Sequence, residues 1–179
     1  MNVLRCRPFN ISDAMILVAA TAISLPLMPP YWVDCLKAIS QGNLGPDAIL
    51  GVANSSTAIL VPSTLAMLLL RLRQPRPAFR RLRNQPGLMA CLTAAITATI
   101  TLIFFFVEFN SYVNADFRVS FFQINSYVAP SVVGSWLTLL LGGRWKAEPG
   151  WIDQLGRCLG WLWIVSFLVS TTIYSLHLD

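Results

Sequence analysis

The chain has 179 residues, of which 55% are hydrophobic and only 12% are charged, and its formal net charge is +5. Soluble domains carry about 25% charged residues, so this composition excludes an ordinary water-soluble domain. A bilayer core requires roughly 20 consecutive apolar residues in a helix. The chain contains five such runs. We therefore expect an all-α, multi-pass membrane protein with a single transmembrane domain over residues 1–179.

The predicted spans follow one another along the chain, at about 14–33, 48–70, 87–107, 124–141 and 154–176. The first of them allows two interpretations. Basic residues before an apolar run, followed by Ala20-Thr21-Ala22, are also features of a cleaved signal peptide. Asp13 interrupts the approach to the run, and the apolar stretch before the small residues is short. We therefore expect an uncleaved span.

Lysine and arginine are distributed unevenly between the two sides that these spans define. Of the 13 basic residues, 11 lie in the N-terminal tail, the 71–86 loop and the 142–157 segment, and only Lys37 and Arg118 lie on the other side. Basic residues concentrate on the cytoplasmic side, so we expect a cytoplasmic N-terminus and an outer C-terminus in the cell membrane. Membrane topology thus explains the charge, and we expect no nucleic-acid partner.

The loop between the second and third spans carries nearly half of the positive charge. Its six arginines are Arg71, Arg73, Arg76, Arg80, Arg81 and Arg83. They are typical of a positive-inside retention signal. The alternative is a dock for anionic lipid or an acidic partner, since each basic residue near an anionic surface contributes about 1 kcal/mol.

Polar residues inside the second and third spans favour helix packing. Asn54 requires a hydrogen-bond partner within the membrane, and the alternative is that it lines a path for a solute or an ion. On the third span, small polar side chains recur at steps of four beside a row of alanines: Thr93, Thr97 and Thr101 beside Ala90, Ala94 and Ala98. We expect a packing seam on this face, with a polar pathway as the alternative.

The last two spans carry further signals of low specificity. Asp153 is placed to cap the start of the fifth span, and Gly156-x-x-x-Gly160 is typical of closely packed helices. Asn-Ser-Tyr occurs at 110–112 and again at 125–127. Chance, or similar interfacial demands on either side of the predicted outer loop, explains this echo, and a shared binding role is the alternative.

Catalytic and metal-binding motifs are missing from the sequence. It has no His-Glu-x-x-His, no Cys-x-x-Cys and no glycine-rich phosphate loop. His177 is the only histidine, so two histidines of this chain cannot ligate a haem. No span holds a charged residue at its centre, as a proton or ion pump would require. The sequence therefore predicts no enzyme and no metal site, and it leaves any cofactor unassigned.

The preferred hypothesis is a non-enzymatic membrane subunit or scaffold that packs against partner membrane proteins through its small-residue seams. One alternative is a small-solute transporter or channel-like protein, with Asn54, Ser55 and Ser56 lining a path. The other is a membrane enzyme whose site lies in the predicted outer loop 108–123, around Glu108 and Asp116.

Overall fold

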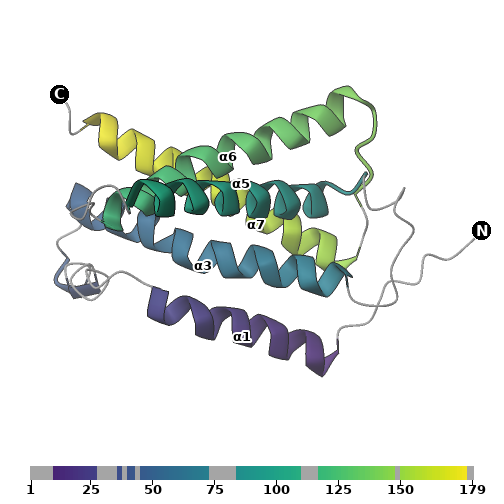
Figure 1. Ribbon diagram of the computed structural model, residues 1–179, viewed down its shortest axis with the longest axis horizontal. Helices are drawn as coiled ribbons and strands as arrows, with labels where there is room; N and C mark the ends of the chain where they lie inside the picture. Colours follow the sequence, from purple (N-terminus) through teal and green to yellow (C-terminus); the bar gives the residue numbers. More distant parts are fainter. Residues whose placement is uncertain are drawn as a thin grey trace, which may run out of the picture.

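The computed structural model describes residues 10–27, 36–37, 40–42, 45–72, 84–109, 117–147 and 150–176. The helices in these ranges are α1 (Ile11–Leu27), α3 (Pro46–Leu72), α5 (Pro86–Phe109), α6 (Phe117–Leu141) and α7 (Trp151–Leu176). No strand occurs within the same ranges. The helices lie together in an elongated bundle (Figure 1). The prediction of an all-α fold is confirmed.

Four helices are long and apolar enough to cross a membrane, over Ala48–Leu72, Pro86–Phe104, Gln123–Leu141 and Trp151–Leu176. The apolar helix at Ile11–Pro26 is shorter than these four. Because the predicted first span, 14–33, continues past the described residues, the count of five spans stays a prediction. The four long helices are consistent with membrane insertion.

Proline and glycine set several helix boundaries. Pro46 and Pro86 are the first residues of α3 and α5, where the missing N–H loses no hydrogen bond and the fixed φ suits a helix. After α6, Gly143 adopts the left-handed conformation, with a φ of 60°. The Arg144 N–H then donates to the carbonyl of Leu139 at 2.9 Å, which satisfies one of the last carbonyls of the helix.

α6 begins at Phe117, seven residues before the predicted span 124–141. Part of the predicted outer loop 108–123 is therefore helical. The segment 117–123 contains neither proline nor glycine. No residue in it stops a helix that already extends through the apolar run, so the helix continues beyond that run.

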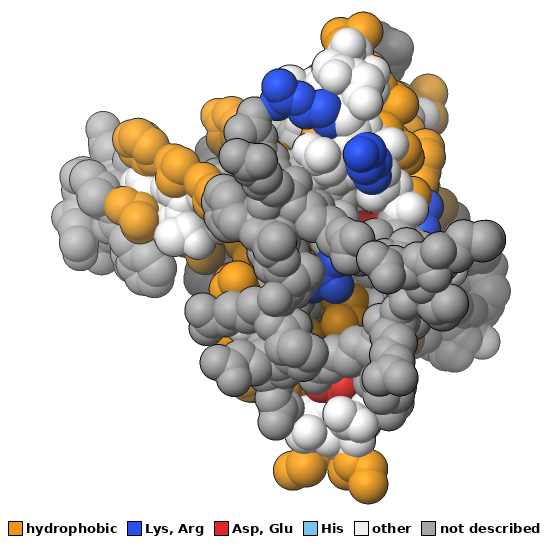
Figure 2. Space-filling view, turned by 90° about the vertical axis from the view of Figure 1, so that its right-hand side faces the viewer, with side chains coloured by type: hydrophobic (Ala, Val, Ile, Leu, Met, Phe, Trp, Pro, Cys, Tyr) orange, Lys and Arg blue, Asp and Glu red, His pale blue; other side chains and the backbone are white. Residues whose placement is uncertain are grey.

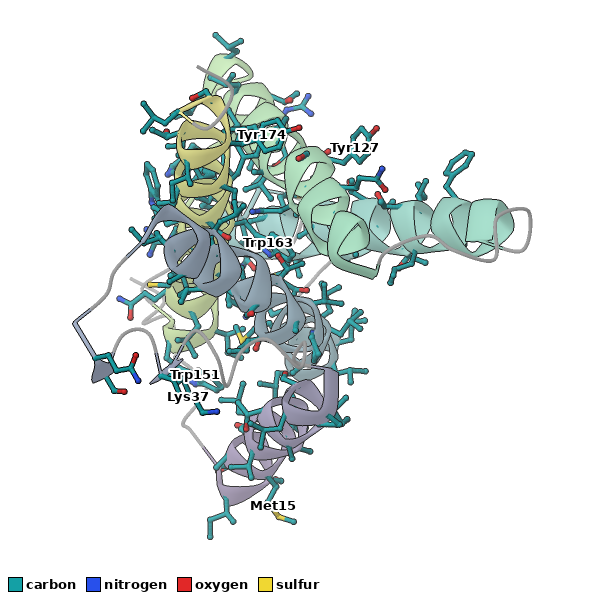
Figure 3. All side chains as sticks on the ribbon, turned by 90° about the vertical axis from the view of Figure 1, so that its left-hand side faces the viewer. Met15, Lys37, Tyr127, Trp151, Trp163 and Tyr174 are labelled. Atoms are coloured by element: carbon teal, nitrogen blue, oxygen red, sulfur yellow. The ribbon has the colours of Figure 1, made fainter. Side chains whose placement is uncertain are left out.

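The core lies where α3, α5, α6 and α7 meet. On α5, the row Ala90, Ala94 and Ala98 faces inward and is at most 2% exposed. Trp136 of α6 and Trp163 of α7 belong to the same buried cluster, and Figure 3 shows Trp163 among the helices. Small side chains on one helix thus make room for large rings from its neighbours, as close packing requires.

α1 packs chiefly against α3. Ile16 and Leu17 contact the buried cluster that includes Met67 and Leu70 of α3. The opposite side of α1 is apolar and exposed, and Met15, which is 67% exposed, points away from the bundle in Figure 3. A continuous exposed apolar surface of this kind suits lipid or another protein rather than water.

Candidate functional site

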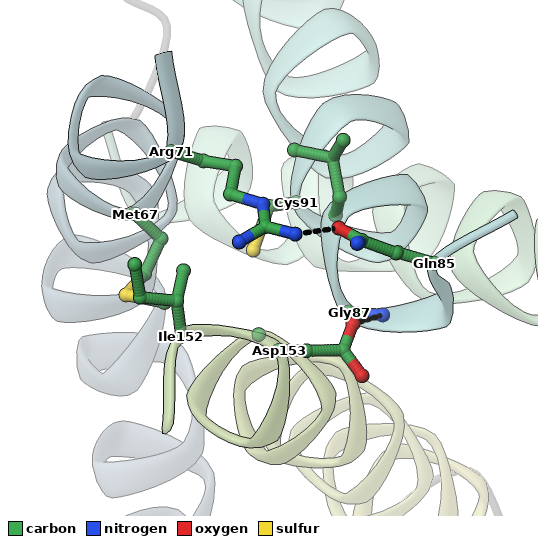
Figure 4. Close-up of a pocket in the computed structure, with 9 residues that line it drawn as sticks. Met67, Arg71, Gln85, Gly87, Cys91, Ile152 and Asp153 are labelled. Atoms are coloured by element: carbon green, nitrogen blue, oxygen red, sulfur yellow. Dashed lines mark hydrogen bonds between the residues drawn. The ribbon is translucent and has the colours of Figure 1, made fainter. Parts of the chain in front are cut away.

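Polar side chains meet at the end of the bundle where α3 ends and α5 and α7 begin, which we call the Arg71 end (Figure 4). Arg71 comes from the last turn of α3, Gln85 precedes α5, and Asp153 lies in the first turn of α7. Arg71 donates Nη2–H to Oε1 of Gln85. Gln85 is only 1% exposed, so this bond joins α3 to the start of α5 away from solvent.

Asp153 joins α7 to α5. Its carboxylate is buried, and Oδ1 accepts the backbone N–H of Gly87 at 3.0 Å. Its Oδ2 lies 3.4 Å from Nε of Arg157. The negative charge therefore lies beside the first turns of both helices, where unpaired N–H groups and the helix dipoles stabilise it. The sequence predicts Asp153 as the cap of a helix that begins at 154, and this prediction is wrong because α7 already begins at Trp151. Asp153 lies inside the first turn of α7, and its carboxylate instead accepts an N–H at the start of α5.

A cavity of about 10 Å³ lies beside this polar cluster. It is lined by Met67, Arg71, Gln85, Gly87, Leu88, Cys91, Ile152, Asp153 and Gly156. The space holds about one water molecule, far less than an organic substrate needs. Among the described residues, no three His, Cys, Asp or Glu side chains come together as a metal site would require. The geometry is that of a polar clamp between helix ends.

Gly156 and Gly160 lie where α7 crosses its neighbours. A Cβ added to Gly156 would lie 2.7 Å from the carbonyl oxygen of Gly87, so the backbones of α5 and α7 touch there. A Cβ on Gly160 would lie 2.6 Å from the ring of Trp136 and 3.1 Å from Cβ of Ala90. Both predicted packing glycines thus contact helices of this same chain.

A second polar cluster lies deeper in the bundle, between α3, α6 and α7. Ser166 donates Oγ–H to the carbonyl of Ala53 at 3.0 Å and accepts from Nδ2 of Asn125 at 3.1 Å. Its Oγ also lies 2.8 Å from Oγ of Ser56. Ser166 therefore connects three helices through one hydroxyl group.

Several polar atoms near this second cluster lack a hydrogen-bond partner among the described residues. They are Oδ1 of Asn125, Oγ1 of Thr57 and Oγ of Ser170, and each of these residues is fully buried. Such groups are costly in an apolar interior. They mark this region as a polar part of the bundle interior.

The threonine row of α5 lies beside the buried alanines and is only partly buried. Thr93 donates to the carbonyls of Met89 and Ala90, and Thr101 donates to that of Thr97. These bonds stay within α5. The three threonines, Ser55 and Ser56 do not line the cavity at the Arg71 end.

Other predicted site residues cannot be placed. Asn54 lies within α3, but its side chain is outside the described part of the structure. The same holds for the side chains of Glu108 and Arg118, and Asp116 lies outside it altogether. Of the six arginines only Arg71 is described; Arg73, Arg76, Arg80, Arg81 and Arg83 fall outside. The lipid dock and the outer-loop site therefore stay predictions.

Sequence reasoning did not single out Ser166 or assign Asn125 a buried role. Asn125 belongs to the repeated Asn-Ser-Tyr triplet, which the sequence indicates as interfacial. A weak signal was present, because Asn125 and Ser166 both interrupt apolar runs. Their meeting could not be foreseen, since 41 positions separate them in the sequence.

A scan against family models matched none, and searches of curated proteins and of solved structures found no significant match either.

Proposed function

We propose that this chain is a non-enzymatic integral membrane subunit or scaffold. We further propose that its N-terminus and its Arg71 end face the cytoplasm. Exposed apolar side chains on all the described long helices support a lipid environment. The orientation is supported by the distribution of basic residues, with 11 on the side predicted to be cytoplasmic and 2 on the other side. Figure 2 looks onto the Arg71 end, where Lys and Arg side chains are visible.

The observation that carries the proposal is the use of the buried polar groups. Asp153 bonds α7 to α5, and Ser166 bonds α7 to α3 and α6. Both groups thus hold helices of this chain together, and the cavity beside Asp153 has room for about one water molecule. An interior whose polar groups bond neighbouring helices to one another is what a scaffold needs.

The partner would contact a surface that the chain does not cover itself. The alanine row and the glycine pair are occupied by internal contacts, so they leave no seam for a partner. The opposite side of α5 is exposed and apolar over Ile96, Ile100, Ile103 and Phe104, each at least 49% exposed. Their spacing follows one face of a helix, as in helix–helix recognition.

The test is to isolate the full chain from native membranes in a mild detergent and to measure the mass of the intact complex. We expect a partner protein to remain bound to the wild type and to a Leu168→Trp control, which changes an exposed residue of α7. Ile96→Trp combined with Ile100→Trp should release it, because two bulky rings block close helix approach. A wild-type chain that is monomeric and bound to no protein would contradict the proposal.

A small-solute transporter is the second candidate, and the polar cluster around Ser166 favours it. Unpartnered polar atoms on Asn125, Thr57 and Ser170 could face a solute path through the bundle. Cysteine placed at Ser170 in a cysteine-free background distinguishes the two functions. Reaction with a membrane-impermeant, water-soluble thiol reagent would indicate a hydrated path. A scaffold predicts no reaction there, and ready reaction in the purified protein at the exposed position Lys146→Cys, between α6 and α7, as the control.

A further inference from the structure

α6 and α7 diverge toward the Arg71 end, as Figure 1 shows. Between them lies a groove of about 700 Å³. It is lined by Val133, Trp136, Leu137, Leu140, Trp145, Gln154, Arg157, Cys158, Trp161 and Ile164. This volume falls within the range of about 300–1,000 Å³ that small-molecule sites occupy. These lining residues are different residues from the six arginines that the sequence indicates as a lipid dock.

The lining of the groove changes from apolar to polar along its length. Because α6 runs toward the Arg71 end and α7 runs away from it, Val133 and Ile164 mark the deep part of the groove. Gln154 and Arg157 mark the part near the Arg71 end. Gln154 and Ile164 are separated by about 15 Å along the helix axis, at 1.5 Å per residue. A ligand that fills the groove must therefore be apolar at one end and polar at the other.

Tryptophans form the wall between these two parts. The ring of Trp136 packs edge-on against those of Trp145 and Trp161, with centroid distances of 6.0 Å and 5.5 Å. Trp161 is 60% exposed and offers its ring to the groove. Tryptophan is enriched where acyl chains meet headgroups, so these rings fit the depth at which a lipid changes from apolar to polar.

Basic side chains lie at and beside the polar end of the groove. Arg157 lies in the lining with its side chain 31% exposed, and a single oxygen of Asp153, 3.4 Å from Nε, faces it. A guanidinium has five N–H donors, so others remain for a ligand. Arg144 and Lys146 are exposed on either side of Trp145, which also lines the groove. Figure 2 shows blue side chains at the top, where α6 ends.

We propose that this groove binds one anionic phospholipid, with its acyl chain between α6 and α7 and its phosphate beside Arg157. Charge complementarity favours a lipid over an apolar helix, because an apolar helix offers no anion to this end of the groove. Arginine is suited to phosphate through its fork of N–H donors. The inference depends on membrane insertion and is independent of the partner protein proposed above.

The first experiment titrates the purified full chain in uncharged detergent with phosphatidylglycerol or with phosphatidylcholine of the same acyl chains. The number of bound lipids is read by intact-complex mass spectrometry. We expect one phosphatidylglycerol to bind preferentially. Arg157→Gln should weaken its binding about fivefold, which is the effect of one basic residue near an anionic lipid. Lys37→Gln removes the same charge outside the groove and should leave the affinity unchanged.

A second pair of variants tests the acyl-chain site. Leu137→Trp fills the groove and should reduce the binding of both lipids. Leu69→Trp, at an exposed position of α3, should not. Circular dichroism and elution volume confirm that each variant is folded. Equal binding of the two lipids by the wild type, or unchanged binding by Leu137→Trp, would overturn the proposal. So would a second copy of the chain occupying the groove.

Cys158 supplies a measurement that needs no substitution. It is exposed and lines the groove, so a bound lipid should slow its alkylation by a maleimide. Peptide mass spectrometry separates it from the other three cysteines. We expect phosphatidylglycerol to protect Cys158 more than phosphatidylcholine does. An alkylation rate that neither lipid changes would contradict the proposal, and it would leave the partner-binding result intact.

Discussion

Gly156→Ala tests the contact on which the Arg71 end depends. The added Cβ would lie 2.7 Å from the carbonyl oxygen of Gly87, 2.8 Å from its carbonyl carbon and 3.0 Å from its Cα. All three atoms belong to the backbone of α5, so no side chain can rotate to relieve the overlap. The two helices must move apart. The hydrogen bond from Gly87 to Asp153, now 3.0 Å long, lengthens as they do.

Two effects lower the free energy of unfolding of the Gly156→Ala variant. Overpacking of a well-packed interior costs about 1–3 kcal/mol. Weakening a buried hydrogen bond to a charged group adds about 1–2 kcal/mol. We therefore expect Gly156→Ala to lower the free energy of unfolding by about 2–5 kcal/mol. The matched control is Gly134→Ala in α6, where an added Cβ meets nothing within 4 Å. There alanine should be neutral, or stabilising by about 0.5–1 kcal/mol through its helix propensity.

The measurement is equilibrium unfolding in mixed micelles of a mild detergent and sodium dodecyl sulfate, followed by circular dichroism. Wild type, Gly156→Ala and Gly134→Ala are compared at equal lipid content. If Gly156→Ala proved as stable as Gly134→Ala, the backbone contact between α5 and α7 would not exist as described. The role assigned to Asp153 would then be wrong as well.

Three further substitutions follow from the same geometry and use the same unfolding assay. Asp153→Ala leaves the buried Gly87 N–H unpaired and should cost about 1–3 kcal/mol, whereas Asp153→Asn keeps an acceptor and should cost less; equal losses would refute this. Ser166→Ala removes three bonds to two neighbouring helices and should cost about 1–2 kcal/mol at the roughly 0.6 kcal/mol typical of each such bond in a membrane. Exposed Ser175→Ala should stay within about 0.5 kcal/mol of wild type. Trp136→Phe keeps most of the ring but loses the buried bond of 3.0 Å to the Pro86 carbonyl, so a loss of about 1 kcal/mol is expected, and no loss would count against that bond.

The helical class and the positions of the long apolar helices follow from the sequence. Runs of apolar residues predict helices because backbone groups in lipid must bond within their own segment. Boundaries were predicted well where proline or glycine lies, as at Pro86 and after Leu141. They were predicted less well where neither does, as at Phe117. The length of an apolar run predicts which part of a helix is apolar. It does not predict how far the helix extends beyond that run into polar residues.

The candidate sites were harder to foresee. The sequence indicates Gly156 and Gly160 as packing residues, because this role depends on local spacing. It wrongly places Asp153 before the helix as a cap, whereas α7 begins at Trp151 and Asp153 lies in its first turn. It does not indicate which helix each one contacts. The spacing of Gly156 and Gly160 shows that they share one face of their helix. The structure shows that α5 and α6 of the same chain cover this face. The packing surface that the sequence suggests for a partner protein is thus covered by helices of this chain.

By itself, the sequence determined the helical class, the apolar lengths and the distribution of basic residues, because each is a property of consecutive residues. Only the tertiary structure decided that Asp153 bonds to Gly87, that Ser166 meets Asn125, and that α6 and α7 leave a groove between them. These contacts join residues 41 or 66 positions apart. They depend on how helices cross, and helix crossing is set by the packing of whole faces rather than by any local pattern.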